Sequence, residues 1–176
     1  TESFRESLEQ AAEQLSYHDL KDFLDNVRFI RWTSTLTSNV LAQGKGPKLG
    51  LIVSPRAEEN LYTSDIADAK AVIPRLVRPE HIVALSEHAD RIEIVGTVKR
   101  LIDQGIRRIN ISFRGAFPSG EREQEVLKII DEQFPDHFLG SVPALAGSEM
   151  LLQPDDMSRT FYALINAYVH NALANS

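Results

Sequence analysis

The chain has 176 residues, 43% of them hydrophobic and 25% charged, so it can bury a core of its own without disulfides or metal ions. Its formal net charge of −6 argues against a nucleic acid or a membrane as partner, because an acidic surface gains no counterion-release energy from either. Because it contains no cysteine, disulfides, iron–sulfur clusters and thiolate zinc sites are excluded. It shows no apolar signal core and no membrane-length apolar run, so we expect a cytoplasmic protein.

The first half of the chain predicts three helices and two strands, followed by a segment with little pattern. The predicted elements are a helix opened by Ser3 and Glu6, a second helix opened by Ser16 and Asp19, a strand over residues 27–31, a helix over 34–43 that ends at Gly44, and a buried strand over 48–54. Between Pro55 and His88, prolines and scattered charges predict only short elements and loops. An internal seam of the chain is therefore expected within residues 55–88.

The second half alternates regularly between helical and extended patterns. It predicts a helix over 92–102 that Gly105 stops, a strand over 109–113, a helix capped by Ser119, a strand over 138–142, and a long final helix capped by Asp155 or Asp156. Helices that alternate with short apolar strands are typical of parallel sheets. The sequence therefore predicts an α/β fold, a layered sheet of parallel strands with flanking helices.

Several polar patterns have simple structural interpretations. The Gly- and Lys-rich residues 44–50 lie between a helix and a strand, whereas a phosphate-binding loop lies between a strand and a helix, so we interpret them as a helix C-cap and a tight turn. The five histidines show no metal-ligand spacing on one helix face, so we expect no metal site, and we expect His81 and His88 at the surface. Three acidic residues are expected on the solvated face and first turn of a helix: Glu121, Glu123 and Glu125.

An unusual group of hydroxyls occupies residues 33–39, where five Ser or Thr side chains and one Asn lead into the predicted helix. A helix N-cap with polar outward positions explains one or two of these hydroxyls. It explains five poorly, because Ser and Thr compete for backbone groups within helices. The alternative is a ligand-facing surface, since α/β proteins bind ligands where a strand ends beside a helix N-terminus. The residues alone leave both interpretations open.

The same segment resembles a motif of the hydantoinase A/oxoprolinase family, His-Gly-Thr-Thr-x-x-Thr-Asn-Ala-Leu. Ser34, Thr35, Ser38 and Asn39 align with its Thr, Thr, Thr and Asn. Further matches follow in order: Gly46, Gly50 and Leu51 in the next turn and strand, residues 109–121 against an apolar strand followed by Asn-Pro-x-His-Glu, and Arg159-Thr160 with Asn166-Ala167-Tyr168 in the final helix. The resemblance covers roughly residues 27–169, and it predicts that residues 1–176 are part of the N-terminal region of a hydantoinase A-like protein.

This resemblance implies part of an actin-like ATPase lobe with a ribonuclease-H-type core. Members of the family use ATP to activate a cyclic amide, such as a hydantoin or 5-oxoproline, for hydrolysis, or a ketone for carboxylation, usually with a second subunit. The shared chemistry is phosphoryl transfer to a carbonyl or enolate oxygen. By resemblance, Ser34 and Thr35 would be catalytic, and Ser38, Asn39 and Arg159 would bind the phosphoryl group or the substrate. For Arg159, a structural ion pair that holds the final helix is the alternative.

Departures from the family pattern narrow this expectation. Trp32 and Thr33 replace the family's His-Gly, which favours the carboxylase branch or an uncharacterised branch over the hydantoin-cleaving one. The family's Asp-x-Gly-Gly-Thr phosphate loop is absent from the 176 residues, so we expect an internal piece of a larger polypeptide that does not turn over substrate alone. ATP and Mg²⁺ would then bind the full-length protein, with the rest of the polypeptide completing the site. The alternative is a non-catalytic α/β module for binding or subunit assembly.

Overall fold

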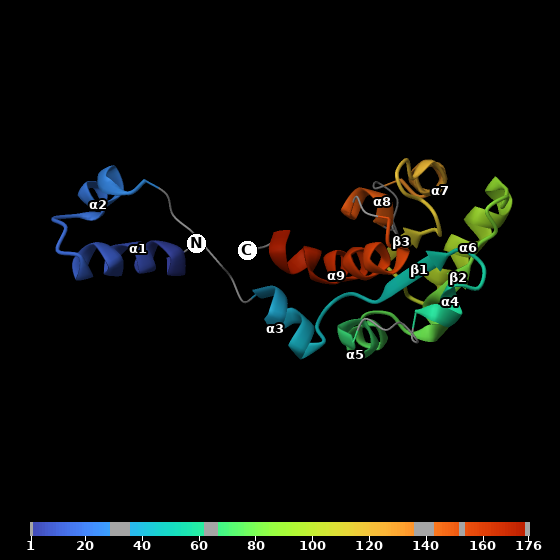
Figure 1. The fold of residues 1–176 in the computed structure, drawn as a ribbon, viewed down its shortest axis with the longest axis horizontal. Coiled ribbons are helices and arrows are strands. Elements are labelled where there is room, and N and C mark those ends of the chain that lie inside the picture. The colour runs from blue at the N-terminus through green and yellow to red at the C-terminus, as the bar shows by residue number, and fades with distance from the viewer. Residues whose placement is uncertain (1, 29–35, 62–66, 136–142, 152–153, 175–176) are drawn as a thin grey trace.

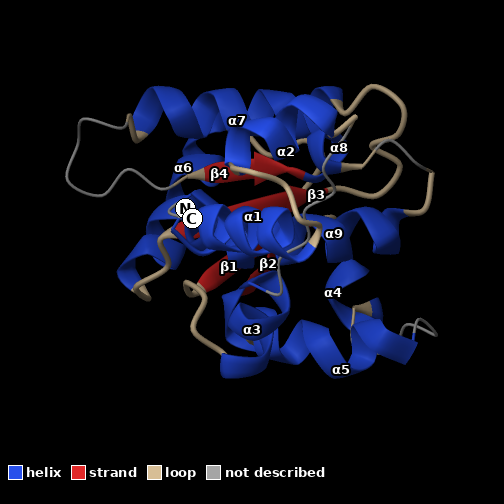
Figure 2. Cartoon of the chain, turned by 90° about the vertical axis from the view of Figure 1, so that its left-hand side faces the viewer, coloured by secondary structure: helices blue, strands red, loops and turns tan. Residues whose placement is uncertain are grey.

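The computed structural model describes residues 2–28, 36–61, 67–135, 143–151 and 154–174. Within these residues, four strands form one parallel sheet in the order β2–β1–β3–β4 (Figure 2). The strands are β1 (Leu49–Val53), β2 (Ile82–Ala84), β3 (Arg108–Ser112) and β4 (Ala144–Ala146). β1 is buried at every position, as an unbroken apolar run in a sheet covered on both faces should be.

Helices cover both faces of this sheet (Figure 1). The helices among the described residues are α1 (Glu2–Gln14), α2 (Leu20–Asn26), α3 (Leu36–Gln43), α4 (Ala57–Asn60), α5 (Ala67–Leu76), the 3-10 helix η1 (Pro79–His81), α6 (Arg91–Asp103), α7 (Glu121–Gln133), α8 (Gly147–Met150) and α9 (Asp156–Ala174), of which all but α1 and α2 lie around the sheet. α6 and α7 pack on one face against Ile52 and Ile109. α3, α5 and α9 pack on the other face against Leu51 and Val53.

The chain changes from one face of the sheet to the other at β2. α4 and α5, which join β1 to β2, lie on the same face as α9, whereas α6 and α7, which follow β2 and β3, lie on the opposite face. β2 and β3 lie on opposite sides of β1 in the sheet. Because crossovers between parallel strands are right-handed, the connection that leads to β2 passes over one face of the sheet and the connection that leads to β3 passes over the other. The carboxyl ends of β1 and β3 therefore meet at a topological switch point, where open α/β sheets bind ligands.

The face of β3 beneath α9 is polar. Arg108, Asn110 and Ser112 are buried there, while the isoleucines between them face α6 and α7. Arg108 Nη1 donates to the carbonyl of Ala167 in α9 at 3.0 Å, and burial lowers the pKa of this guanidinium from its usual value. α9 is therefore held on this strand by hydrogen bonds as well as by apolar contacts.

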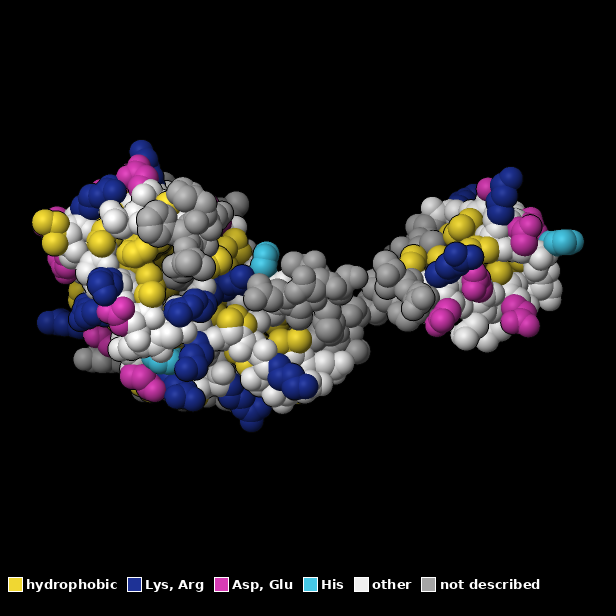
Figure 3. Space-filling view, turned by 180° about the vertical axis from the view of Figure 1, so that it is seen from behind, with side chains coloured by type: hydrophobic (Ala, Val, Ile, Leu, Met, Phe, Trp, Pro, Cys, Tyr) yellow, Lys and Arg dark blue, Asp and Glu magenta, His cyan; other side chains and the backbone are white. Residues whose placement is uncertain are grey.

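α1 and α2 pack on each other and lie apart from the sheet (Figures 1 and 3). The rings of Tyr17 and Phe23 meet edge to face, with centroids 5.4 Å apart. Asp19 caps α2, as predicted, by accepting the N–H of Asp22 at 2.7 Å. Leu15 and Leu24 remain 64% and 40% exposed on this pair of helices. None of the described helices of the chain is long and apolar enough to cross a membrane.

The predicted elements of the central part are confirmed with small shifts, as α3, β1, α6, β3, α7 and α9. The predicted Ser119 cap is wrong, because Gly120 occupies the N-cap of α7 with a φ of +62° and no side chain caps that helix. Of the strand predicted over 27–31, residues 27 and 28 are described, and neither is extended in a strand: Val27 is the C-cap of α2 and residue 28 lies in a bend. Residues 29–31 and the predicted strand over 138–142 lie outside the described residues. Within residues 55–88, β2 pairs with β1 in the common sheet.

One prediction about the histidines is wrong. His81 was expected at the surface, but it is only 8% exposed because it ends η1 and enters the sheet beside β2. His88 is exposed, as expected. The charged Arg78 and Glu80 before His81 suggest a surface position, whereas the apolar residues 82–85 that follow it are the sign of burial.

Two glycines shape the turn between α3 and β1. Gly44 ends α3 with a φ of +63°, as the C-cap interpretation predicts. Gly46 lies against the ring of Tyr168 in α9, so closely that an added Cβ would overlap the ring carbons. This turn therefore joins α3 and β1 to α9, and the ring leaves room only for glycine at position 46.

We expect Gly46→Ala to lower the free energy of unfolding by about 1–3 kcal/mol, because the ring or the turn must move to admit the methyl group. Urea unfolding would measure the change. Gly96→Ala is the matched control: outside the backbone of α6 itself, no atom lies within 4 Å of its added Cβ, so it should stabilise the protein by about 0.5–1 kcal/mol. Equal effects of the two substitutions would contradict the close contact with Tyr168.

Candidate functional site

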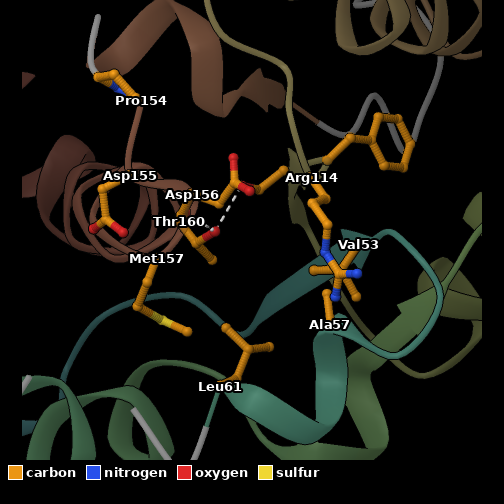
Figure 4. A pocket seen from close by; sticks show the side chains of 11 residues that line it. Val53, Ala57, Leu61, Arg114, Pro154, Asp155, Asp156, Met157 and Thr160 are labelled. Carbon is orange, nitrogen blue, oxygen red and sulfur yellow. Dashed lines mark hydrogen bonds between the residues drawn. The ribbon is translucent and has the colours of Figure 1, made fainter. Parts of the chain in front are cut away.

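A cavity of about 330 Å³ lies at the carboxyl ends of β1 and β3, at the switch point of the sheet (Figure 4). Its walls come from the end of β1, from α4, from the residues after β3 and from the start of α9. The apolar lining consists of Val53, Ala57, Leu61, Phe113, Pro154 and Met157, and the polar lining of Ser112, Arg114, Asp155, Asp156 and Thr160. An apolar wall with a few convergent polar groups is the usual composition of a small-molecule site.

Two buried hydroxyls link β3 to α9 at this cavity. Ser112 Oγ and Thr160 Oγ1 are 2.6 Å apart. Thr160 Oγ1 donates to the carbonyl of Asp156, one turn earlier in α9, at 2.8 Å. When Thr160 donates to this carbonyl, the proton between the two hydroxyls comes from Ser112. In that arrangement both protons are engaged, and the hydroxyls accept a hydrogen bond from a ligand rather than donate one.

Arg159 attaches the start of α9 to the end of β3. Its side chain is fully buried, and Nη2 donates to the carbonyl of Phe113 at 3.1 Å and to Asp156 Oδ1 at 2.5 Å. The Asp156 carboxylate also accepts the N–H of Gly115, at 3.1 and 3.2 Å from its two oxygens. These contacts fit the structural alternative for Arg159, and a binding role for it stays a prediction.

Glu123 corrects an expectation about the acidic residues of α7. It was placed with Glu121 and Glu125 on a solvated face, but its side chain is fully buried. Glu123 Oε1 accepts the N–H of Phe113 at 2.7 Å, and Oε2 accepts the N–H of Ser148 at 2.7 Å. One carboxylate thus joins the residues that follow β3 and β4.

The sequence carried a signal for this buried position. Glu123 precedes Val126 and Ile130, both buried, by three and seven residues, which is the spacing of one helix face. Its place in the first turn of α7 also puts the carboxylate at the positive end of the helix dipole, which offsets part of the cost of burying the charge.

Among the described residues that line the cavity, Arg114 is the one cationic side chain. Its backbone N–H donates to Ser54 Oγ at 2.9 Å, which fixes the backbone beside the end of β1. Its guanidinium extends toward Ala57 (Figure 4) and has no hydrogen-bond or ion-pair partner among the described residues. Arg114 also lines a neighbouring cavity of about 330 Å³, together with His88 and Glu121. Arg114 therefore lies between two cavities, both at the carboxyl ends of the strands.

Asp155 caps α9 at the opposite wall. Its Oδ2 accepts the N–H of Ser158 at 2.8 Å. Hydrogen bonds from the Ser158 hydroxyl and backbone lower the pKa of Asp155 below its usual value. The carboxylate therefore stays ionised as an acceptor facing the cavity at neutral pH.

The residues predicted to form the site are placed as follows. Ser34 and Thr35 lie outside the described residues. Ser38 and Asn39 are exposed on α3. α3 packs through Val40 and Leu41 in the same core as Tyr168, toward the far end of α9 from Arg159 (Figure 1). The structure therefore does not bring the described α3 residues to the cavity beside Arg159, and their roles stay predictions.

The sequence model of a protein family, the hydantoinase/oxoprolinase N-terminal region, matches residues 1–134. The chain belongs to this family. The acetophenone carboxylase gamma subunit of Aromatoleum aromaticum is 25% identical to it over 183 residues, which cover 89% of this chain and 25% of that subunit. The family predicted from the hydroxyl-rich motif is thereby confirmed.

Two solved structures share the fold, and the predicted α/β class is confirmed with them. An acetone carboxylase in its nucleotide-free structure has a TM-score of 0.65 and 17% identity, over 81% of this chain and 23% of that one. The ATP-dependent caprolactamase from Pseudomonas jessenii has a TM-score of 0.66 and 20% identity, over 97% of this chain and 26% of that one. The chain spans about a quarter of the length of these relatives.

We expect Glu123→Gln to lower the free energy of unfolding by about 1–3 kcal/mol, because the amide NH₂ would face one of two buried N–H groups that need an acceptor. Urea unfolding would measure the loss. Glu121→Gln, at an exposed position of the same helix turn, is the matched control and should change stability little. A Glu123→Gln variant as stable as the control would show that the carboxylate does not hold the strand ends.

We expect Asp155→Ala to lower stability by about 1 kcal/mol at neutral pH, through loss of the α9 cap. Because folding lowers the pKa of Asp155, its contribution is present above the unfolded pKa of about 3.9 and is lost as the pH falls through the folded value. The difference between wild type and variant should therefore shrink in unfolding curves recorded below about pH 4. Asp25→Ala, exposed in α2, is the control; a difference that stays constant with pH would contradict the cap.

Proposed function

We propose that this chain forms part of the substrate site of an ATP-dependent enzyme that activates the carbonyl group of a small ketone or cyclic amide, by phosphoryl transfer to the carbonyl or enolate oxygen. The observation that carries the proposal is the cavity at the carboxyl ends of β1 and β3, where an apolar wall faces the guanidinium of Arg114. The names of the relatives indicate acetone, acetophenone and a caprolactam. Each of these joins a small apolar skeleton to one carbonyl oxygen, which is the shape that such a cavity suits.

Arg114 is the residue that we assign to the carbonyl oxygen. The hydroxyls of Ser112 and Thr160 are already bonded to each other and to the carbonyl of Asp156, and ionised carboxylates only accept. Among the described residues that line the cavity, Arg114 is therefore the side chain whose donors have no partner in the described part of the protein and are available to a carbonyl group. A fixed cation becomes more stabilising as negative charge develops on that oxygen, so it favours the transition state over the bound substrate.

The described residues do not fit ATP or Mg²⁺. No group of three or more His, Cys, Asp or Glu side chains among them could hold a metal ion. β1 is followed by Ser54 and Pro55. In the loop after β3, the N–H groups of Gly115 and Gly120 are already bonded to Asp156 and Ala116, so they do not form a free cradle for phosphates. We therefore assign ATP and Mg²⁺ to other parts of the full-length protein, and the carbonyl compound to this chain.

We infer that the rest of a longer polypeptide and a second subunit complete the site in a cytoplasmic enzyme. The Aromatoleum relative is itself named as a gamma subunit, and this chain spans a quarter of it. Exposed Leu15 and Leu24 on the α1–α2 pair support a contact outside the described fold. The same leucines would serve a non-catalytic assembly module, which is the competing function.

We expect Arg114→Gln to reduce substrate-stimulated ATP hydrolysis by about 10²-fold in kcat, because the variant loses the charge beside the carbonyl oxygen. Phosphate release by the assembled enzyme would be measured with acetone, acetophenone and caprolactam. Arg91→Gln is the matched control, since it removes an exposed cation whose surface ion pair with Glu132 contributes little.

Two outcomes would contradict the proposal. Full activity of Arg114→Gln with a compound that stimulates the wild type would remove the assigned role of this cation. Absence of stimulation by every ketone and cyclic amide, with the second subunit present, would favour the assembly module instead.

A further inference from the structure

A second group of cavities lies where the strands of the sheet begin, at the edge opposite the Arg114 cavity. We call this the amino edge. One hollow of about 150 Å³ is bounded by the α3–β1 turn, the end of α5, η1 and Tyr168 of α9. Four basic side chains line it: Lys48, Arg75, Arg78 and His81. None of the described residues that line it is acidic, although the chain as a whole carries a net charge of −6.

The basic groups around this hollow are weakly engaged by the protein. Lys48 and Arg75 have no hydrogen-bond or ion-pair partner within the described part of the chain. Arg78 has one contact, with Glu80 at 3.7 Å, and both side chains are more than half exposed, so this pair contributes little. Arg75 lies in the last turn of α5, where a cation suits the helix dipole, but that accounts for one of the four.

His81 and the glycine turn complete the enclosure. The His81 side chain is buried beside the hollow, and Gly44 and Gly46 allow the turn to pass close to the Tyr168 ring. Four cationic or polar donors facing one small space, without a carboxylate, create a positive potential that an anion with several oxygens would satisfy.

An apolar hollow of about 110 Å³ adjoins the basic one. The two share Arg75, Leu76 and Tyr168, and the apolar hollow adds Leu41 and Ala42 of α3 and Val72 of α5. A ligand that fills both must therefore combine an anionic head with a short apolar part. The basic hollow alone has room for about five water molecules, which suits a phosphate group and is too small for a nucleotide.

We infer that this edge of the sheet binds a small organic phosphate, with the phosphate among Lys48, Arg75, Arg78 and His81 and a short apolar or aromatic part between α3 and α5. A phosphate fits better than a carboxylate because its two charges and several acceptor oxygens match four surrounding donors. The site is at the opposite edge from the Arg114 cavity, so its assignment does not rest on the carbonyl substrate proposed there.

Isothermal titration of the purified protein with inorganic phosphate and with phenyl phosphate, in a low-salt buffer, tests this site. Phenyl phosphate should bind more tightly than inorganic phosphate. The double variant Lys48→Gln/Arg75→Gln should weaken both by roughly tenfold or more, because charge-assisted hydrogen bonds are lost. Lys128→Gln, an exposed lysine on α7, is the control and should leave both affinities unchanged.

A third variant separates the two hollows. Ala42→Leu adds bulk to the apolar hollow, so it should remove the preference for phenyl phosphate and leave the affinity for inorganic phosphate unchanged. Binding that weakens equally in Lys128→Gln would show attraction to surface charge only and would overturn the site. Failure of both probes to bind at millimolar concentration would overturn it as well, and equal affinities for the two probes would overturn the organic part.

Discussion

The carboxylate of Glu123 is the constraint on which the carboxyl edge of the sheet depends. It is buried, and no Lys or Arg in the described ranges pairs with it. Its charge is met instead by the N–H groups of Phe113 and Ser148, which follow neighbouring strands. Because an unsatisfied buried charge is costly, either strand end can move only by giving up one of these bonds. The residues after β3, and with them Arg114, are therefore fixed by an interaction that begins in α7.

Phe113 is held from both faces of the sheet by groups of opposite charge. Its N–H donates to Glu123 of α7, and its carbonyl accepts from Arg159 of α9. Asp156, the ion-pair partner of Arg159, then binds the N–H of Gly115 two residues later. The backbone on both sides of Arg114 is thus set before any ligand binds. Such pre-organisation lets the guanidinium act at one place without reordering the loop that carries it.

The sequence predicts the fold better than the site, for a physical reason. The apolar run of β1 and the left-handed Gly44 are local signals, and local signals agree with the global structure here. Glu123 was misplaced because its partners are backbone N–H groups, 10 and 25 residues away, which residue type cannot reveal, and because a glutamate by itself suggests a solvent-exposed position. Arg159 was singled out by a motif, but only the structure shows that its contacts are with Phe113 and Asp156. Arg114, the central residue of the candidate site, stands in no local sequence pattern that predicts a role for it.

α9 runs from the carboxyl edge of the sheet, where the strands end, to the amino edge, where they begin. Thr160 lines the carboxyl-edge cavity and Tyr168 lines the amino-edge hollow, about 12 Å further along the same helix. α9 contacts the sheet in two ways, through apolar side chains such as Leu164 and through buried hydrogen bonds to the polar face of β3. Displacement of Tyr168 by a ligand can reach Thr160 through this one helix, and any such effect is a thermodynamic linkage between the two edges. By reciprocity, whatever factor one ligand imposes on the affinity of the other is returned unchanged.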